Sequence, residues 1–263
     1  MNLKITKKIY TEQDLDKIFE KFELKNKPNL FVASDLGKLG IIKNKNKIST
    51  LETIYNNLIK YNKNMNIIVP TATINIINTD IVYDQLKTKS HKMGSFSEYI
   101  RTMKGATRSF HPIWSLSGIG PNIKEYFYNI SKHAYDNNSV FSRLYKNDFY
   151  FLSLGAHPRF TLSIVHHIEH INKVPYRFKK GFIINYFDSK GKVHKEEFFL
   201  DVLKEEYRYA KRLKNKKIFD FFEKNNTFYN FEIGKGNVSL FSYKDFFNST
   251  NKLMNKDIYS WFK

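Results

Sequence analysis

The sequence predicts an α/β protein in which a central mixed sheet carries helices on both faces and is followed by C-terminal hairpins and helices. Short apolar runs at 30–33, 66–69 and 149–154 are typical of buried strands. Segments with helical spacing of apolar residues separate these runs. Near the C-terminus, strand-like segments flank the turn sequences 188–191 and 234–236, which is the pattern of hairpins.

The first half of the chain alternates predicted helices and strands. Thr11 followed by Asp14 resembles a capping box, and apolar residues at helical spacing continue to Phe22, so we expect a helix here. After the strand at 30–33, a second helix is expected to open at 49–52. The strand at 66–69 ends at a proline. Apolar spacing predicts two further helices, over 94–103 and 121–130.

The central stretch reads as strand, loop and helix. The apolar run 149–154 ends at Gly155, and Pro158 prevents the strand from continuing inside a sheet. From Phe160 the apolar spacing becomes helical. The loop therefore lies at the carboxyl end of a strand, where open α/β sheets place their ligands.

The last third of the chain predicts two hairpins and two helices. The expected elements are strands over 181–187 and 192–200, a long charged helix over 202–224, strands over 228–233 and 238–243, and a closing helix over 245–262.

Length and composition indicate one domain. With 263 residues, of which 41% are hydrophobic, the chain can bury a substantial core, and we expect residues 1–263 to form a single domain. The absence of cysteine excludes disulfides, thiolate metal sites and a cysteine nucleophile. No apolar signal segment opens the sequence, and no apolar run approaches the length of a membrane span. We therefore expect a cytoplasmic protein that does not act at a membrane.

The net charge of +19 has two interpretations. A basic protein suits an anionic partner, such as nucleic acid or a phosphorylated small molecule. The chain is also rich in Asn and Ile, as products of AT-rich genomes tend to be, and its lysines are scattered without a nucleic-acid motif. We favour compositional bias for most of the excess and expect no nucleic-acid partner.

Two stretches combine reactive side chains with turn-forming residues. The first contains Arg101, Gly105-Ala106, Arg108-Ser109-Phe110-His111-Pro112, Ser115 and Gly120. The second contains Leu154-Gly155, Ser163-Ile164-Val165-His166, Glu169 and Pro175-Tyr176-Arg177. Together they resemble the aminoglycoside 3-N-acetyltransferase family, whose motifs include Arg-Ser-x-His-Pro, Thr-x-x-His-x-x-Glu and Pro-Tyr-Arg. Ser163 stands here in place of the family threonine.

The resemblance implies acetyl-CoA as co-substrate and no metal. The family's coenzyme-contacting His-Ser-Ser-Leu-x-x-x-Gly element falls on 33–40, where Ala33 and Asp35 replace its histidine and second serine. Two arginines are candidates for the coenzyme phosphates, because guanidinium groups bind phosphate oxygens in bidentate fashion. His111 either supports a site side chain or packs in the core. The expected coenzyme-binding residues are Ser34, Leu36, Gly37, Lys38, Gly40, Pro70, Thr71, Arg101, Arg108, Ser109, His111 and Ser115.

N-acetyl transfer assigns roles to three residues of the second stretch. A neutral amine must attack a thioester carbonyl while a base takes its proton and donors stabilise the developing oxyanion. His166 is the candidate base, since an imidazole pKa of about 6.5 suits proton transfer at neutral pH. Glu169, on the same helix face, would orient the ring, and Ser163 would supply a hydroxyl near the carbonyl. Without a cysteine, direct transfer in a ternary complex is expected.

A zinc peptidase is a remote alternative. The segment from His166 to His170 reads His-His-Ile-Glu-His and so contains the His-x-x-Glu-His pattern, with Glu205 or Glu206 as a conceivable third ligand. This interpretation leaves the Arg-Ser-x-His-Pro stretch without a role, so we rank it well below acetyl transfer.

The acceptor is expected to be a small-molecule amine on a sugar. The family name implies aminoglycoside antibiotics, but these are polycations and are poorly steered toward a protein this basic. We therefore prefer an amino sugar with a negative charge, such as a nucleotide-linked one in surface-glycan biosynthesis, and keep the antibiotic as the alternative. A homodimer is one assembly that the sequence leaves open.

Overall fold

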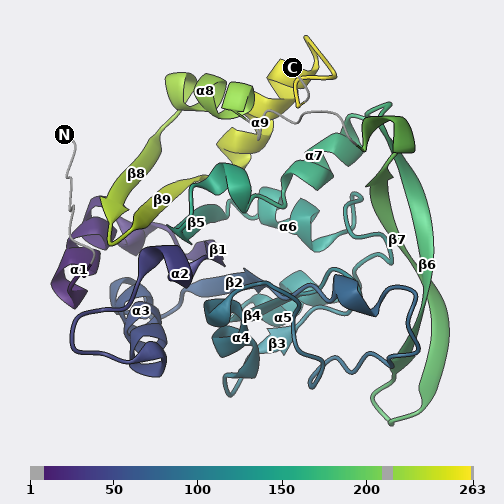
Figure 1. The fold of residues 1–263 in the computed structure, drawn as a ribbon, viewed down its shortest axis with the longest axis horizontal. Coiled ribbons are helices and arrows are strands. Elements are labelled where there is room, and N and C mark those ends of the chain that lie inside the picture. Colours follow the sequence, from purple (N-terminus) through teal and green to yellow (C-terminus); the bar gives the residue numbers. More distant parts are fainter. Residues whose placement is uncertain (1–8, 209–215, 262–263) are drawn as a thin grey trace.

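A seven-stranded mixed sheet forms the centre of the molecule, as predicted (Figure 1). The computed structural model describes residues 9–208 and 216–261. The strand order is β3-β4-β2-β1-β5-β9-β8, in which β1 is parallel to β2 and β5 and all other pairs are antiparallel. The strands of this sheet are β1 (Asn29–Ser34), β2 (Asn66–Pro70), β3 (Thr107–Arg108), β4 (Leu116–Ile119), β5 (Tyr150–Gly155), β8 (Phe228–Ile233) and β9 (Gly236–Ser242).

Helices cover both faces of the sheet because successive strand residues point to opposite sides. In β1, Leu30 and Val32 join the core beneath the first set of helices, whereas Phe31 and Ala33 join the core beneath the second. The first set is α1 (Glu12–Lys21), α3 (Lys47–Tyr61) and α4 (Ser95–Thr102). The second set is α5 (Ile123–Phe127), α6 (Val140–Lys146), α7 (Val165–Ile171), α8 (Lys216–Asn225) and α9 (Tyr243–Met254).

Local capping signals set the helix starts. The Thr11 hydroxyl accepts the Asp14 amide at 3.1 Å and the Asp14 carboxylate accepts the Thr11 amide at 2.9 Å, which confirms the predicted capping box of α1. The helix α3 begins before the predicted 49–52 opening, because Asn46 is its N-cap and Ser49 is the reciprocal partner in the first turn. Loss of such a cap costs about 1 kcal/mol.

The long helix predicted over 202–224 is wrong. β6 (Arg177–Phe187) and β7 (Val193–Leu203) pair along their whole length and form a ribbon along one side of the molecule (Figure 1). The first residues of the predicted helix therefore belong to β7, which ends at Leu203. A 3₁₀ turn over Glu205–Tyr207 follows. Residues 209–215 of the prediction lie outside the described residues, and α8 forms its end.

Other boundaries also differ. The helix predicted over 121–130 ends as α5 at Phe127, and Asn129 then adopts a positive φ of 47°. The closing helix α9 starts at Tyr243, capped by Ser242, and ends at Met254 rather than near 262. The strands β3 and β4 and the helix α6 were not predicted from the sequence.

A close backbone contact aligns the loops that follow β1 and β5. Gly155 has a φ of +97°, and a Cβ on it would lie 2.1 Å from the Asp35 carbonyl oxygen. Only glycine tolerates both this conformation and this approach. The loop after β1 therefore packs directly against the end of β5, ahead of a 3₁₀ turn at Pro158–Phe160 and the start of α7. The helix predicted from Phe160 thus begins later, at Val165.

Candidate active site

A cavity of about 290 Å³ opens where the parallel strands β1 and β2 end. Because parallel strands place their carboxyl ends at one edge of a sheet, residues distant in sequence meet there. Four of the predicted site residues line the cavity: Ser34, Pro70, Ser163 and His166. The other lining residues are Ala33, Lys92, Met93, Trp114, Thr161 and Leu162.

His166 and Glu169 form a hydrogen-bonded pair in α7. His166 Nδ1 donates to Glu169 Oε2 at 2.9 Å, and Arg177 Nε lies 2.6 Å from the same oxygen. Glu169 is only 3% exposed. Burial acts to raise the pKa of Glu169, but the hydrogen bond from His166 and the positive charge of Arg177 outweigh it and hold that pKa below its usual value. An ionised carboxylate at Nδ1 leaves the lone pair of the imidazole on Nε2.

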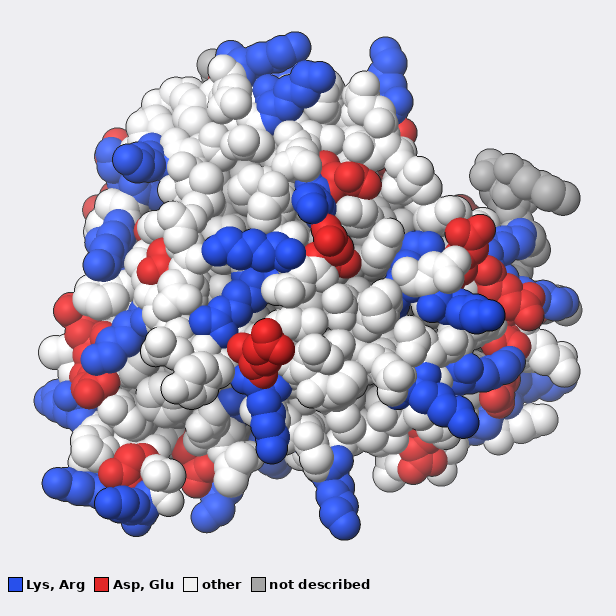
Figure 2. Space-filling model, turned by 180° about the vertical axis from the view of Figure 1, so that it is seen from behind, with Lys and Arg blue, Asp and Glu red and all other residues white. Residues whose placement is uncertain are grey.

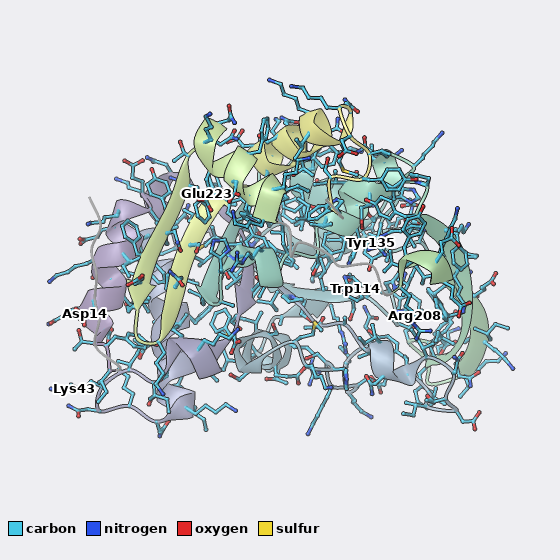
Figure 3. All side chains as sticks on the ribbon, turned by 45° about the horizontal axis from the view of Figure 1, so that its top comes forward. Asp14, Lys43, Trp114, Tyr135, Arg208 and Glu223 are labelled. Carbon is cyan, nitrogen blue, oxygen red and sulfur yellow. The ribbon has the colours of Figure 1, made fainter. Side chains whose placement is uncertain are left out.

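Two aromatic rings hold the His166 imidazole. Its centroid lies 6.3 Å from that of Trp114, edge to face, and 5.2 Å from that of Tyr135. Figure 3 shows Trp114 and Tyr135 close together in the half of the molecule away from Asp14 and Lys43. The Trp114 Nε1–H is buried and has no hydrogen-bond partner among the described residues. Trp114 was not predicted, although it lies inside the 101–120 stretch.

His111 supports Trp114 and does not line the cavity. Its Nδ1 accepts the Trp114 amide at 3.0 Å, and its Nε2 donates to the Lys132 carbonyl at 3.1 Å. The side chain is buried, and this burial lowers the pKa of His111 to about 4. A direct coenzyme contact is therefore not the role that the geometry supports for His111.

The buried His111 predicts a loss of stability in acid. Its folded-state pKa of about 4 lies below its unfolded value, so the unfolded chain binds the extra proton first. The contribution is complete above about pH 6.5 and falls toward pH 4, with about 2 kcal/mol lost between pH 7 and pH 5. Urea unfolding at these two pH values should show a shallower decrease for His111→Gln than for the wild type, and parallel decreases would contradict this assignment.

Arg108, which the sequence predicted as a phosphate ligand, is buried in the core of the protein. Its guanidinium group donates to Ser115 Oγ at 2.9 Å and to the carbonyls of Thr71 and Thr88, each at 2.6 Å. Ser115 Oγ donates in turn to the Thr71 carbonyl at 2.8 Å. These three predicted coenzyme residues, Thr71, Arg108 and Ser115, thus tie β2 to the segment before β4. Ser109 belongs to the same region, where its hydroxyl accepts the amide of the residue that opens β4 at 2.9 Å.

The guanidinium group of Arg101 also forms hydrogen bonds within the protein. Its Nε and Nη2 atoms donate to the Glu98 carboxylate at 2.9–3.1 Å, and Nη1 donates to the Leu86 carbonyl at 2.6 Å. The side chain is 6% exposed. The guanidinium group is thus engaged by Glu98 and the Leu86 carbonyl.

The stretch from Ser34, the last residue of β1, to Gly40 contributes one residue to the cavity. Residues Leu36, Gly37 and Lys38 belong to the one-turn helix α2 (Leu36–Leu39), and Gly40 caps it with a φ of 93°. None of these four lines the cavity. Ser34 does, and its hydroxyl is buried without a hydrogen-bond partner among the described residues.

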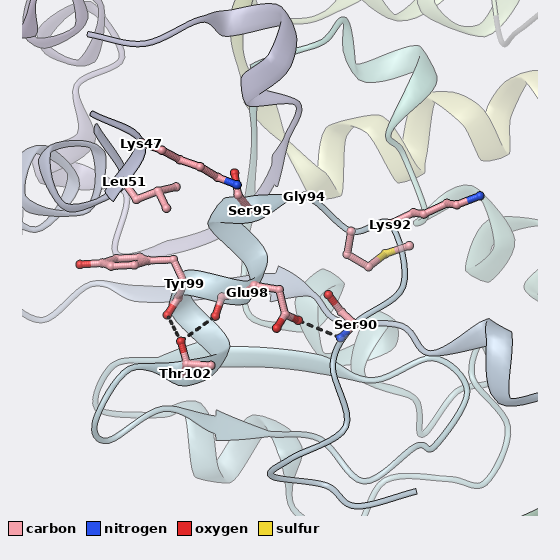
Figure 4. Close-up of a pocket in the computed structure, with 10 residues that line it drawn as sticks. Lys47, Leu51, Ser90, Lys92, Gly94, Ser95, Glu98, Tyr99 and Thr102 are labelled. Atoms are coloured by element: carbon pink, nitrogen blue, oxygen red, sulfur yellow. Dashed lines mark hydrogen bonds between the residues drawn. The ribbon is translucent and has the colours of Figure 1, made fainter. Parts of the chain in front are cut away.

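A second cavity of about 470 Å³ adjoins the first (Figure 4). The two share Lys92 and Met93. Figure 4 shows Lys47, from the start of α3, pointing toward Ser95 at the start of α4. The N-cap of α4 is Gly94, so no side chain caps the helix. The amides of an uncapped helix start and two lysines form a setting suited to phosphate oxygens.

The ligand set of the zinc-peptidase alternative is not assembled. His166 Nδ1 bonds to Glu169, whereas His170 Nδ1 bonds to Asp201 at 2.6 Å. Within residues 9–208 and 216–261, the histidine and carboxylate group that converges is His133, His170 and Asp201. The two histidines of the His-x-x-Glu-His pattern therefore bond to two different carboxylates, Glu169 and Asp201.

On the face shown in Figure 2, lysine and arginine side chains are dispersed, with acidic side chains between them, and do not form one continuous band. Among the described helices, none is long and apolar enough to cross a membrane.

The sequence profile of the family described as aminoglycoside 3-N-acetyltransferase matches residues 31–255. The fold is similar to that of the YokD protein from Bacillus subtilis, with a TM-score of 0.75 and 18% sequence identity over 94% of this chain and 100% of that chain. For AAC-IIIb in a binary complex with CoASH, the TM-score is 0.77 and the identity 16%, over 94% of this chain and 97% of that chain. For AAC-VIa bound to sisomicin, the values are 0.76 and 17%, over 94% and 98%. No curated protein matches the sequence.

Proposed function

The chain belongs to the aminoglycoside 3-N-acetyltransferase family, and we propose that it acetylates the amino group of an anionic amino sugar with His166 as the general base. The protein is thus an acyltransferase that uses acetyl-CoA, as its family does. The observation that carries the proposed site is the pairing of His166 with the buried Glu169 beside a cavity at the ends of β1 and β2.

His166 is suited to accept a proton at Nε2. Its Nδ1–H is held by Glu169, whose carboxylate stabilises the imidazolium formed when the attacking amine loses its proton. Acetyl-CoA, when bound, supplies the activated acyl carbon and a thiol leaving group. Ser163 and Trp114 both line this cavity, and the Ser163 hydroxyl and the Trp114 Nε1–H are the proposed donors to the acyl oxygen. The chain has no cysteine, so direct transfer to the amine is the mechanism we propose.

The two adjoining cavities suit an elongated coenzyme. The unpartnered Ser34 hydroxyl in the first cavity is an orphaned polar atom that a ligand would satisfy. In the second cavity, Lys47, Lys92 and the amide groups that open α4 would hold the phosphates. The complex of AAC-IIIb with CoASH supports a coenzyme site in this fold. We therefore replace Arg101 and Arg108 by the two lysines as the proposed phosphate ligands.

Removing both lysines should weaken coenzyme binding. For Lys47→Gln/Lys92→Gln we expect an increase in the Kd for CoA of about tenfold, since each substitution removes a charged donor to phosphate. Isothermal titration calorimetry measures this directly. The matched control is Lys224→Gln/Lys252→Gln, which changes the net charge equally at exposed positions in α8 and α9. Equal weakening in both variants would indicate a general charge effect instead.

The lining of the first cavity favours an acceptor without multiple positive charges. Lys92 and His166 are the lining residues with an ionisable side chain, and no carboxylate lines the cavity among the described residues. A polycation would need acidic partners there. This agrees with the net charge of +19, and it supports an anionic amino sugar, such as a nucleotide-linked sugar of surface-glycan biosynthesis. The complex of AAC-VIa with sisomicin supports the alternative, an aminoglycoside acceptor.

A direct assay separates the two acceptors. The enzyme is incubated with acetyl-CoA and either nucleotide-linked amino sugars or sisomicin and gentamicin, while the free thiol of CoA is measured. We expect thiol release with the nucleotide-linked sugars. Release with the antibiotics alone would overturn the acceptor assignment and leave the acetyl transfer intact.

A further inference from the structure

We propose that a separate cavity at the C-terminal end of α7 binds a phosphate group, and that this group belongs to the acceptor. The cavity measures about 220 Å³ and lies between α7 and the β6–β7 ribbon. Its charged or titratable lining residues are Glu169, His170, Lys173, Arg177, Lys179 and Asp201. Assigning the phosphate to the acceptor rests on the proposed function, but the binding itself does not.

The cavity contains a second imidazole–carboxylate pair, built like that of His166 and Glu169. His170 Nδ1 lies 2.6 Å from Asp201 Oδ2, and His133 Nε2 lies 3.2 Å from Asp201 Oδ1. Burial acts to raise the pKa of Asp201, but hydrogen bonds from both imidazoles outweigh it and hold that pKa well below its usual value. The ionised Asp201 carboxylate accepts the Nδ1–H of His170. When Nε2 is also protonated, His170 can donate to an oxyanion.

The hydrogen bonds of His133 argue against a metal ion in this group. Its Nδ1 accepts the backbone amide of Tyr135 at 3.1 Å, so in the neutral ring the proton lies on Nε2 and is donated to Asp201. A metal ligand has the opposite arrangement, with the lone pair on the metal side and the proton on the outer nitrogen. Each Asp201 oxygen is, moreover, already occupied by one imidazole.

The charge balance of the cavity favours an anion. The Glu169 carboxylate is paired with both His166 and Arg177, and the Asp201 carboxylate accepts from two imidazoles. In the described part of the chain, Lys173 and Lys179 have no carboxylate partner. Lys179 Nζ lies 3.8 Å from the centroid of the Phe199 ring, at the side of the ribbon. Two unpaired ammonium groups and an imidazole donor form an oxyanion site with the chemistry of a phosphate receptor.

The distance of this site from His166 suits a phosphate carried by the acceptor. His166 and His170 are four residues apart on one face of α7, a rise of about 6 Å. Each imidazole has an aromatic neighbour from the same segment: the ring centroid of Tyr135 lies 5.2 Å from that of His166, and the ring centroid of His133 lies 4.5 Å from that of His170. An amino sugar with its amine at His166 can therefore extend a phosphate one helical turn along this face, a length similar to that of one sugar ring.

Inorganic pyrophosphate is the probe that tests the site. The ring proton resonances of His170 are followed by NMR during titration of the full-length protein, with His170→Gln used for assignment. We expect a saturable shift of His170. Lys173→Gln/Lys179→Gln should weaken the apparent affinity at least tenfold, whereas the charge-matched Lys224→Gln/Lys252→Gln should change it less than twofold. The absence of a saturable shift, or equal weakening in both double variants, would overturn the proposal.

Two further arms identify the source of the phosphate and exclude a metal. With saturating CoA present, pyrophosphate should still bind with unchanged affinity; complete displacement would mean that the site holds a coenzyme phosphate, and the acceptor assignment would fail. Micromolar zinc should not shift His133 and His170 together, and a stoichiometric shift would replace the anion site by a metal site. Because no arm depends on turnover, these outcomes are independent of whether acetyl transfer itself is demonstrated.

Discussion

Replacing His166 by Ala is expected to lower the turnover number for acetyl transfer by about a hundredfold or more, the usual contribution of a positioned general base. The imidazole is the one titratable group that both lines the cavity and is oriented by a buried carboxylate. Its removal leaves the incoming amine without a proton acceptor, but does not touch the lysines and helix start proposed to hold the coenzyme. Turnover is measured by thiol release, and the Kd for CoA by calorimetry.

The control for His166→Ala is His194→Ala. His194 lies on the ribbon, is 35% exposed and pairs with Asp188 at 2.8 Å, so it is also a histidine with a carboxylate partner. We expect wild-type turnover in the control and an unchanged CoA affinity in both variants. Full activity of His166→Ala would remove the proposed base, whereas loss of CoA binding would show that the substitution disturbs the coenzyme site.

We propose that Glu169 acts through His166, so substitution of Glu169 should lower turnover less than substitution of His166. The sequence placed these two side chains on one helix face because they are three residues apart, and the structure brings them to 2.9 Å. Their shared partner Arg177 follows the helix after a turn and enters from the start of β6. Spacing along a helix thus predicted the pair, while the third member depended on how the chain returns after α7.

Local signals account for most of the fold that the sequence predicted. The capping box of α1 and the apolar runs of β1, β2 and β5 depend only on residues that are close together in the sequence. The strand β4 was missed because it contains Ser117 and Gly118 and is defined by its partner β2. A Cβ on Gly118 would lie 2.9 Å from the Ile67 carbonyl oxygen, so close packing of two strands, which is not visible locally, selects glycine there.

The hydrogen-bond partners of Arg108 could not be predicted from the sequence. An arginine in a family motif suggested a phosphate ligand, because the guanidinium group suits phosphate. Its actual partners come from residues 71, 85, 88 and 115, which only the fold brings together. Whether an arginine binds a ligand or the protein depends on burial, and Arg108 is 4% exposed.

Arg108→Met should therefore destabilise the protein and leave coenzyme binding nearly unchanged. The substitution keeps much of the apolar volume but removes the donors to Ser115 Oγ and to the Thr71 carbonyl, which remain buried, and to the carbonyl of the half-buried Thr88. Each unsatisfied buried acceptor costs about 1–3 kcal/mol, so we expect the free energy of unfolding to fall by about 4 kcal/mol. The lost contact of the guanidinium carbon with the Tyr83 ring, 5.2 Å from its centroid, adds to this.

Urea unfolding and CoA titration of the same Arg108→Met sample distinguish the two roles of this arginine. If the guanidinium group holds the core, stability falls and the Kd for CoA, measured below the unfolding transition, stays within about threefold of the wild type. If it holds a phosphate, stability is retained and the Kd rises at least tenfold. Arg108→Lys adds a further test, because an ammonium group keeps the charge but cannot reach Ser115, Thr71 and Thr88 at once. We expect this variant to recover less than half of the lost stability, since the core needs the geometry of the guanidinium group more than its charge.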